Sequence, residues 1–322
     1  MKKILFYDCA SPFSYDSQTL NTRAIGGTEA TVIRVAEALS TIHDITVAQA
    51  YRSEKDKNHG HLTMVRYVPL EYPVLHDYDV LICVRKIDER CKNFKGQTFV
   101  LCQNFDEDIL EIGSFLKNTN GTLISVSNHL MRLNKELIPG IKHTCIYNPI
   151  DDDLIKDNTP RNKNKLVFFS SPHKGFFDTL YAFGLMRTII PELTLYYSNP
   201  GYIHWPHQTP DNAINLGQLP FTEIIKHVRE AFCVFYINRI FPETFGLIYA
   251  EANAVGTPVL AHDFGAAREI LHPNNPVIDC NNLLQVRDTF LQWYFERSPI
   301  VEVVEKFKIS NVMKHWIDLI EN

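Results

Sequence analysis

The chain of 322 residues is long enough for two domains, since a domain holds about 150 residues. Hydrophobic residues make up 45% of it and charged residues 21%, a globular composition that excludes a disordered chain, a coiled coil and a collagen-like fibre. The 32 basic and 37 acidic side chains give a net charge of −5, which argues against broad binding of nucleic acid.

The sequence shows no membrane-spanning or export signal. No apolar run approaches the roughly 18 residues that span a bilayer, and Asp8 interrupts the first apolar run too early for a signal peptide. The seven cysteines are scattered without a CxxC pair, so we expect free thiols in a reducing compartment and no structural zinc. These features predict a cytoplasmic protein with at most peripheral membrane contact.

The first half of the chain alternates short apolar runs with helical patterns. Buried strands are predicted at residues 4–7, 45–48, 80–84, 98–101 and 123–126. Helices are predicted at residues 28–40, 107–116 and 128–137, the last with Ser127 as its N-cap. Apolar strands separated by helices are typical of a parallel sheet that is covered on both faces.

The second half repeats this alternation after a polar segment at residues 151–165, which its charges and Pro160 mark as a linker. Strands are predicted at 166–169, 193–197, 233–237 and 258–261, and helices at 176–188, 221–229, 245–255, 283–295 and 312–320. We therefore expect an α/β fold of two domains, at residues 1–150 and 151–322. The C-terminal helix is a candidate to pack back on the first domain. In such sheets, ligands bind beyond the carboxyl ends of the strands.

Two loops at predicted helix starts carry residues suited to phosphate. Gly26 and Gly27 allow a ligand to approach the backbone closely, and the free N–H groups of a helix start favour an anion. A flexible turn capped by Thr28 is the alternative, and the dinucleotide fingerprint GxGxxG is missing. In the second loop, Ser170-Ser171-Pro172-His173-Lys174-Gly175, Lys174 is placed to meet a phosphate, with a solvated lysine as the alternative.

Two carboxylates stand out in the second half. Glu243 lies just before a predicted helix, and Glu251, eight residues later, lies two turns inside it. Helical geometry then places them near one face and roughly 12 Å apart along the axis. That distance excludes an acid–base pair on one bond but suits a ligand with a sugar at one end and a ribose at the other. Free N–H groups at residues 244–246 would then face phosphates. A helix with one N-terminal acid and one surface acid is the alternative.

The segment from Glu243 to Glu251, followed by Gly256-Thr257-Pro258-Val259, resembles the E-x7-E region of retaining glycosyltransferases of family 4. The resemblance extends over nearly the whole chain. Its other segments are Gly26-Gly27-Thr28-Glu29, Val126-Ser127-Asn128, Tyr147-Asn148-Pro149-Ile150-Asp151, Phe169-Ser170-Ser171-Pro172-His173-Lys174-Gly175 and Gly265-Ala266-Ala267-Arg268-Glu269. The resemblance implies the GT-B fold, in which two Rossmann-like domains face a central cleft.

The resemblance also implies the roles of individual residues. Glu251 would bind the donor ribose, Glu243 would hold the transferred sugar, and Lys174 would stabilise the departing diphosphate. Lys174 and Glu243 are therefore the expected catalytic residues, and Gly27 would abut the donor phosphate. The expected donor-binding set is Gly26, Gly27, Ser170, Ser171, Lys174, Glu243, Thr244, Phe245, Gly246, Leu247 and Glu251.

The sequence departs from the family at two places. Phe169 or Ser170 stands where many relatives carry an arginine, so a second cation would come from elsewhere. Residues 101–106 lack the histidine of many relatives, which leaves Asn104 and Asp106 as candidates to face the acceptor. Residues 1–150 carry 17 basic and 17 acidic side chains, and this neutral charge gives little support for strong membrane adhesion.

The implied function is retaining transfer of a sugar from a UDP- or GDP-linked donor to a glycan or lipid-linked acceptor, as in polysaccharide biosynthesis. No metal or other cofactor is expected, since preorganised positive charge would stabilise the leaving diphosphate. Asp151-Asp152-Asp153 matches the D-x-D of metal-dependent glycosyltransferases, but we favour a solvated acidic stretch, and a surface loop for His59-Gly60-His61. The alternatives are a nucleotide-sugar epimerase and a non-catalytic protein that binds nucleotide sugars.

Overall fold

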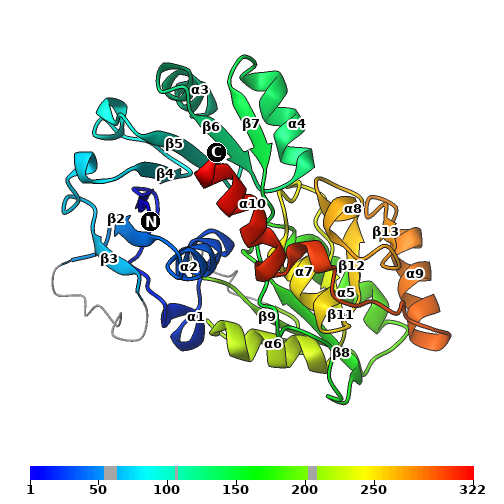
Figure 1. The fold of residues 1–322 in the computed structure, drawn as a ribbon. Coiled ribbons are helices and arrows are strands. Elements are labelled where there is room, and N and C mark those ends of the chain that lie inside the picture. Colours follow the sequence, from blue (N-terminus) through cyan, green and yellow to red (C-terminus); the bar gives the residue numbers. More distant parts are fainter. Residues whose placement is uncertain (54–63, 106–107, 202–208) are drawn as a thin grey trace. The chain divides into compact units, whose positions relative to one another are not determined.

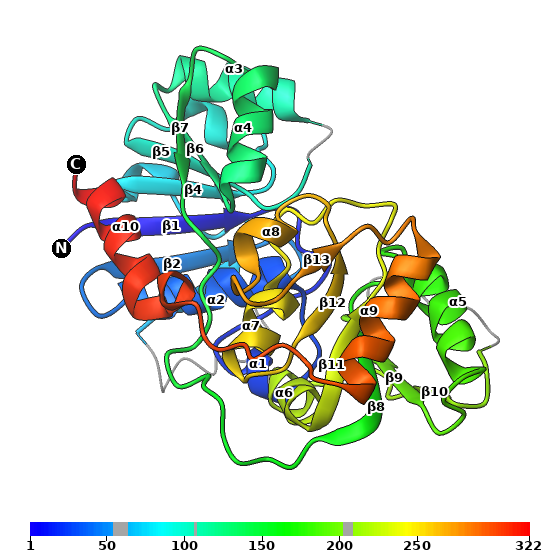
Figure 2. The same ribbon diagram turned by 90° about the vertical axis from the view of Figure 1, so that its right-hand side faces the viewer.

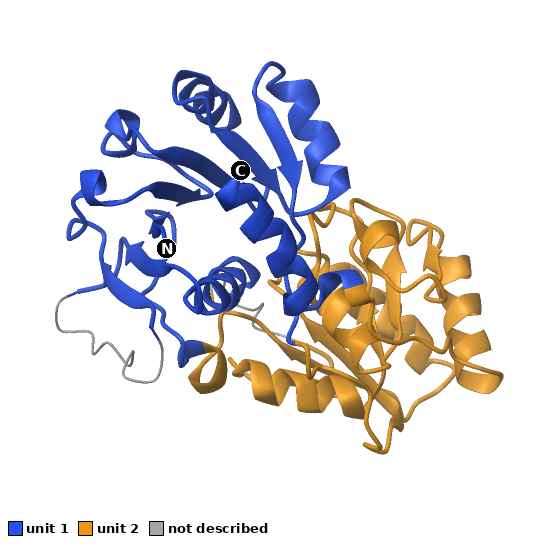
Figure 3. Cartoon of the chain, in the orientation of Figure 1, with its two compact units in different colours: residues 1–19, 26–151, 306–322 blue, residues 20–25, 152–305 orange. Residues whose placement is uncertain are grey.

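A computed structural model describes residues 1–53, 64–105, 108–201 and 209–322 of the chain (Figure 1). The chain divides into two compact units (Figure 3). Unit 1 comprises residues 1–19, 26–151 and 306–322, and unit 2 comprises residues 20–25 and 152–305. The chain thus passes from unit 1 to unit 2 directly after Asp151, and residues 306–322 belong to unit 1.

In its described residues, unit 1 contains a seven-stranded parallel sheet in the order β3-β2-β1-β4-β5-β6-β7. The strands are β1 (Lys3–Asp8), β2 (Asp44–Gln49), β3 (Arg66–Pro69), β4 (Val80–Val84), β5 (Gln97–Cys102), β6 (Thr122–Ser125) and β7 (Lys142–Cys145). The helices are α2 (Gly27–Leu39), α3 (Ile109–Asn118), α4 (Asn128–Leu137), α10 (Ile309–Glu321), η1 (Leu75–Asp77) and η2 (Cys91–Asn93). The short helices α1 (Thr19–Thr22) and η3 (Glu305–Phe307) lie where the chain changes unit.

The core of unit 1 follows from its apolar strands. Residues 80–84, which form β4, are fully buried, as a strand with both faces covered requires. Helix α2 packs on β2, and α4 packs on β6 and β7. The C-terminal helix α10 packs on α2 (Figure 2). The ring of Trp316 in α10 lies 6.3 Å from the ring of Phe6 in β1, measured between centroids.

Unit 2 contains, in the residues that the structure describes, a six-stranded parallel sheet in the order β10-β9-β8-β11-β12-β13. The strands are β8 (Asn162–Phe169), β9 (Thr194–Ser198), β10 (Ala213–Asn215), β11 (Ala231–Tyr236), β12 (Val259–His262) and β13 (Val277–Ile278). The helices are α5 (Phe176–Arg187), α6 (Phe221–Glu230), α7 (Leu247–Ala254), α8 (Ala267–Ile270) and α9 (Leu283–Phe295). Two parallel sheets with helices confirm the predicted α/β fold of two Rossmann-like domains.

Most predicted elements are present, but several boundaries differ and some elements were not predicted, among them the short helices α1 and α8. Helix α7 begins at Leu247 rather than at residue 245, because Gly246 adopts a left-handed conformation with φ of +82°, which is incompatible with a right-handed helix at that residue. Strand β8 begins at Asn162, so the last residues of the predicted linker are part of the sheet. The sequence patterns also missed β3, β7, β10 and β13, which include the edge strands of both sheets.

The segment that leaves unit 1 is held by a buried arginine. Arg34 of α2 donates two hydrogen bonds of 3.0 Å to the Asp151 carboxylate, from Nε and from one terminal nitrogen. The neighbouring Ile150 pairs with the returning chain, since its N–H donates to the Phe307 carbonyl at 2.8 Å and its carbonyl accepts from Ile309 at 2.9 Å. Asp151 is therefore an ion-pair partner and not simply part of a solvated acidic stretch.

The structure also describes the cysteines and the apolar character of the helices. All seven cysteines are free thiols, and five of them are buried. None of the helices in the described ranges combines the length and apolar character that are needed to cross a bilayer.

Candidate functional site

The carboxyl ends of adjacent strands in unit 2 bring the expected catalytic residues together. Strands β8, β11 and β12 are neighbours, and they end at Phe169, Tyr236 and His262. Because parallel strands end at the same edge of a sheet, the loops that follow these strands share that edge. Lys174 comes from the loop after β8 and Glu243 from the loop after β11, so two distant segments supply one site.

Lys174 and Glu243 form an ion pair at this edge. The Lys174 Nζ donates to Oε1 of Glu243 at 3.1 Å and to Oε2 at 3.0 Å. The Glu243 side chain is 6% exposed and the Lys174 side chain 31% exposed, so the carboxylate is enclosed while the ammonium remains accessible. A buried carboxylate needs such partners, because transfer of an unpaired charge from water is very costly.

The backbone of Glu243 is held by Gly265. The two residues form an isolated parallel β-bridge, and the N–H of Ala266 donates to the Glu243 carbonyl at 2.8 Å. Gly265 has φ of +66°, and a Cβ atom there would lie only 2.4 Å from the Glu243 carbonyl oxygen. Only glycine combines this conformation with this close approach. Gly265 and Ala266, the first two residues of the segment Gly265-Ala266-Ala267-Arg268-Glu269, thus position Glu243 through its backbone.

Tyr236, which no sequence motif marks, also contacts the Glu243 carboxylate. Its hydroxyl donates to Oε1 of Glu243 at 2.5 Å and lies 3.1 Å from the Ser170 hydroxyl. Burial, followed by the charge of Glu243, raises the pKa of Tyr236 well above its ordinary value, so the phenol stays protonated. As the last residue of an apolar strand, Tyr236 has the pattern of an ordinary core aromatic, and no signal in the sequence distinguishes it.

Glu251 lies within α7 and is 6% exposed. Glu243 precedes α7, as predicted, but the roughly 12 Å spacing between Glu243 and Glu251 applied helical rise from residue 243, whereas the helix begins only at Leu247. The N–H groups at the start of α7 belong to the N-cap Gly246, to Leu247 and to Ile248, so the helix start lies further along the chain than the predicted residues 244–246. Thr244 and Phe245 form the loop before this cap.

The phosphate-loop candidate after β8 is a turn. The N–H of Lys174 donates to the Ser171 carbonyl at 3.0 Å, and Gly175 ends the turn with φ of +82° as the N-cap of α5. A Cβ at Gly175 would lie 2.6 Å from the Asn238 backbone, so the loop packs closely on the segment after β11. Burial, then the neighbouring lysine charge, lowers the pKa of His173, whose imidazole is therefore neutral at pH 7.

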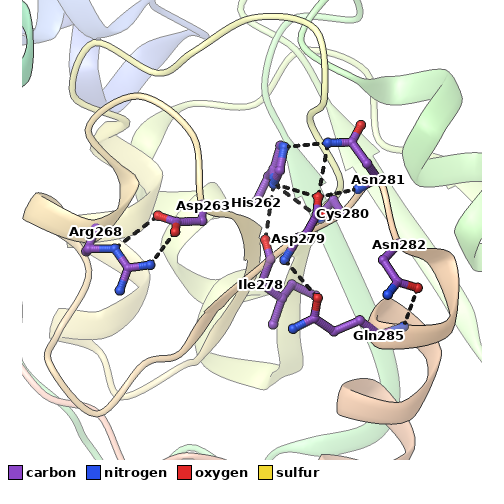
Figure 4. Close-up of polar contacts among 9 residues, drawn as sticks. All are labelled: His262, Asp263, Arg268, Ile278, Asp279, Cys280, Asn281, Asn282 and Gln285. Atoms are coloured by element: carbon purple, nitrogen blue, oxygen red, sulfur yellow. Dashed lines mark hydrogen bonds and ion pairs between the residues drawn. The ribbon is translucent and has the colours of Figure 1, made fainter.

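A second polar cluster lies at the ends of β12 and β13 (Figure 4). Nδ1 of His262 lies 3.1 Å from the Ile278 carbonyl oxygen, and Nε2 lies 3.2 Å from the Asn281 side-chain nitrogen. On the other side, Arg268 pairs with Asp263 (Figure 4). The His262 contacts connect the end of β12 to the end of β13 and to the segment after it, whereas the Arg268–Asp263 pair lies within the segment that follows β12.

In unit 1 the glycine loop leads into a buried ionic cluster. Gly26 is the N-cap of α2 with extended backbone, so Thr28 is not the cap. Arg85 directly follows β4 with φ of +65° and lies 3.3 Å from Glu29 and 3.8 Å from Asp8. Both carboxylates are fully buried, and burial raises the pKa of Asp8. In the sequence, Glu29 stands out only as a member of the segment Gly26-Gly27-Thr28-Glu29.

Of the candidate acceptor-side residues, the structure describes only Asn104. Asn104 is exposed just after β5, whereas Asp106 and the segment His59-Gly60-His61 lie outside the described residues. Among the residues that the structure does describe, no three His, Cys, Asp or Glu side chains are grouped so that they could hold a metal ion.

Comparison with known proteins adds a partial family match. A family described as Glycosyl transferases group 1 matches residues 204–294, a segment of unit 2 that includes Glu243 and Glu251. A search of curated proteins finds no match for this chain.

Solved structures share the fold at low sequence identity. A glycosyltransferase from Rickettsia africae is 14% identical with a TM-score of 0.72, over 99% of this chain and 98% of that one. TarM is 15% identical with a TM-score of 0.60, over 76% of this chain and 55% of TarM, so this chain spans about half of TarM's length. UDP-GlcNAc 2-epimerase from Neisseria meningitidis is 12% identical with a TM-score of 0.56, over 99% of this chain and 100% of that one. The fold is GT-B, and together with the family match it supports a glycosyltransferase.

Proposed function

We propose that this protein is a retaining glycosyltransferase that moves a sugar from a nucleotide diphosphate sugar to an acceptor hydroxyl. The proposal rests on the ion pair between Lys174 and Glu243 at the carboxyl edge of the unit 2 sheet. Glu243 lies in the segment that matches group 1 glycosyltransferases. A site of this kind offers one cation for a phosphate and one carboxylate for sugar hydroxyls, which are the two chemistries that the donor presents.

Lys174 would stabilise the leaving group. In glycosyl transfer the bond between the sugar C1 and the β-phosphate oxygen breaks, and both bonding electrons remain on the diphosphate. A preorganised ammonium beside that oxygen stabilises the charge as it develops. The N–H groups of Leu247 and Ile248 at the start of α7 would add the positive end of a helix dipole. With these groups in place, we propose that transfer needs no divalent cation and no cofactor.

Glu243 would hold hydroxyls of the transferred sugar, and Glu251 those of the donor ribose. The acceptor oxygen would then attack C1 on the face that the diphosphate leaves, and the acceptor proton would pass to a phosphate oxygen. This order of steps retains the configuration at C1, and the acceptor proton is accounted for without a separate protein base. Gly26, Gly27, Ser170, Ser171, Thr244, Phe245, Gly246 and Leu247 complete the proposed donor-binding set.

The donor is proposed to be UDP- or GDP-linked, and the acceptor to be a glycan or a lipid-linked sugar of polysaccharide biosynthesis. Asn104 and Asp106 are proposed to face this acceptor. The protein would work in the cytoplasm with at most peripheral membrane contact. The epimerase that shares the fold was solved with UDP-GlcNAc bound, so UDP sugars come first in the test.

Calorimetry with a panel of UDP and GDP sugars tests the donor, followed by incubation of the bound donor with sugar acceptors. The expected result is tight binding of one donor and a glycoside product in which the C1 configuration is retained. As a control, Lys226→Ala removes another lysine that is paired with a glutamate, Glu223, in the same unit. It should leave donor binding unchanged. Failure of every nucleotide sugar to bind would refute the proposal.

An epimerase is the second candidate, because UDP-GlcNAc 2-epimerase has the same fold. It would convert the bound nucleotide sugar without an acceptor, so appearance of the epimer in the absence of acceptor would decide in its favour. A non-catalytic binding protein would bind the donor and yield neither the glycoside nor the epimer.

A further inference from the structure

Tyr236 connects the proposed catalytic pair to the interior of unit 2. Its hydroxyl has one proton, and that proton is donated to Oε1 of Glu243 at 2.5 Å. The Ser170 hydroxyl, 3.1 Å away, must therefore be the donor in its own bond to Tyr236. The result is a directed hydrogen-bond chain from Ser170 through Tyr236 to Glu243, with Lys174 as the other partner of the same carboxylate.

The Tyr236 ring is held rigidly. The residue is fully buried, its ring stacks on Phe168 with centroids 5.2 Å apart at 13°, and Tyr249 contacts it edge-on at 5.4 Å and 88°. Side chains packed in this way keep one rotamer, so the hydroxyl position is fixed before any ligand arrives. A fixed donor on one carboxylate oxygen also fixes the orientation of the whole carboxylate.

The two partners of Glu243 differ in mobility. Lys174 is a flexible side chain that is 31% exposed and is free to turn towards an incoming phosphate. Tyr236 is enclosed by packing and cannot leave. When a donor binds and attracts Lys174, the bond from Tyr236 is therefore the one that keeps Glu243 in place.

We propose that Tyr236 is a positioning residue that orients Glu243 toward the hydroxyls of the transferred sugar, with Ser170 fixing the phenol in turn. This inference rests on the proposed function, because it takes the sugar to be the partner of Glu243. It assigns Tyr236 no contact with the reacting atoms. Its effect should appear with the sugar-bearing donor and not with the nucleotide portion alone.

The test compares Tyr236→Phe with Tyr249→Phe, which removes a neighbouring buried hydroxyl outside the chain from Ser170 to Glu243. Calorimetry measures binding of UDP-GlcNAc and of UDP, and of GDP-mannose and GDP if the wild type prefers guanine. Loss of one hydrogen bond to a carboxylate should weaken binding of the nucleotide sugar by roughly tenfold. Binding of the nucleoside diphosphate should not change, and Tyr249→Phe should resemble the wild type for both ligands.

A double-mutant cycle separates positioning from simple packing. In a Glu243→Ala background, Tyr236→Phe should cause no further loss of sugar binding, because its target is already gone. Additive losses would overturn the inference, as would an equal loss of nucleotide sugar and nucleoside diphosphate. If Tyr236→Phe fails to fold, Tyr236→Met replaces it, since it also removes the hydroxyl and keeps an apolar side chain, and the same selective loss of nucleotide-sugar binding is expected.

The two proposals fail in different ways. If the wild type binds neither nucleotide sugars nor nucleoside diphosphates, the proposed function fails and this inference with it. If the wild type binds its nucleotide sugar and Tyr236→Phe binds it equally well, only the role of Tyr236 is overturned.

Discussion

The Lys174 ammonium lies 3.1 Å from one oxygen and 3.0 Å from the other oxygen of the Glu243 carboxylate. The two residues proposed to meet the diphosphate and the sugar thus neutralise each other in the free protein. A bound diphosphate would compete for the accessible lysine, while the buried carboxylate keeps its other contacts. The pair would therefore exchange its internal ion pair for contacts with a ligand that brings both anionic and hydroxyl groups.

Lys174→Ala should lower kcat by roughly 10²–10³, by analogy with loss of one donor from an oxyanion site. The donor KM should change less, because the interaction grows as charge develops in the transition state. Lys174→Arg should keep part of the activity, although the guanidinium fork has a different geometry. Initial-rate kinetics measure these changes, with Lys226→Ala as the control.

A wild-type kcat in the Lys174→Ala variant would show that Lys174 does not stabilise the leaving group. Lys174 would then serve only as the ion-pair partner of the buried Glu243 carboxylate, and its removal would lower stability without lowering kcat.

Glu251→Ala should weaken donor binding, because hydrogen bonds between a carboxylate and ribose hydroxyls contribute about 1.5–3 kcal/mol. Calorimetry with the matching nucleoside diphosphate is the appropriate measurement, since the ribose is present there without the sugar. Asp288→Ala, which removes an exposed acid of α9, serves as the control. Unchanged affinity in a folded Glu251→Ala protein would exclude Glu251 from the site.

Gly265→Ala should impair donor binding and lower stability together. The new Cβ would meet the Glu243 carbonyl oxygen at 2.4 Å in a backbone with φ of +66°, so Glu243 must move. Gly184→Ala is the matched control: Gly184 is exposed in α5, and a Cβ there meets nothing within 4 Å. It should raise the unfolding free energy by about 0.5–1 kcal/mol and leave binding unchanged. Wild-type binding by Gly265→Ala would contradict the bridge as a positioning element.

Excess EDTA should leave the transfer rate unchanged, because Lys174 and the start of α7 are proposed to supply the positive charge. Asp153→Ala, which removes an exposed carboxylate, should also retain activity. Asp151→Ala should instead lower thermal stability, because it leaves the buried Arg34 without its carboxylate partner. Complete loss with EDTA, restored by Mn²⁺ or Mg²⁺, would contradict metal-independent transfer.

The sequence predicts the elements whose local signals agree with their burial. Helix α4 spans the predicted residues, and the Ser127 side chain caps it by accepting from the Leu130 N–H at 3.1 Å. Edge strands such as β7 were missed because they are short and polar, and their exposed side removes the apolar pattern. The start of α7 was misplaced because the left-handed turn at Gly246 overrides helical periodicity.

Parts of the candidate site could not be predicted because they depend on distant contacts. Lys174 and Glu243 were recognised through motifs, but their ion pair joins residues 69 positions apart. In the sequence Tyr236 is indistinguishable from an apolar core residue, and only the structure places its hydroxyl beside Glu243. The partnership of Arg34 with Asp151 spans 117 positions, and no spacing rule connects them. Such pairs depend on topology rather than on any local signal.

The packing of α10 on α2 has a consequence for the order of folding during synthesis. The sheet of unit 2 is complete once residue 278 has been made, whereas the core of unit 1 still lacks Trp316, the partner of Phe6. The unit that begins first therefore finishes last, with its buried face open while the intervening unit is translated. A nascent chain stalled before residue 306 should hold a protease-resistant unit 2 beside an incomplete, chaperone-dependent unit 1.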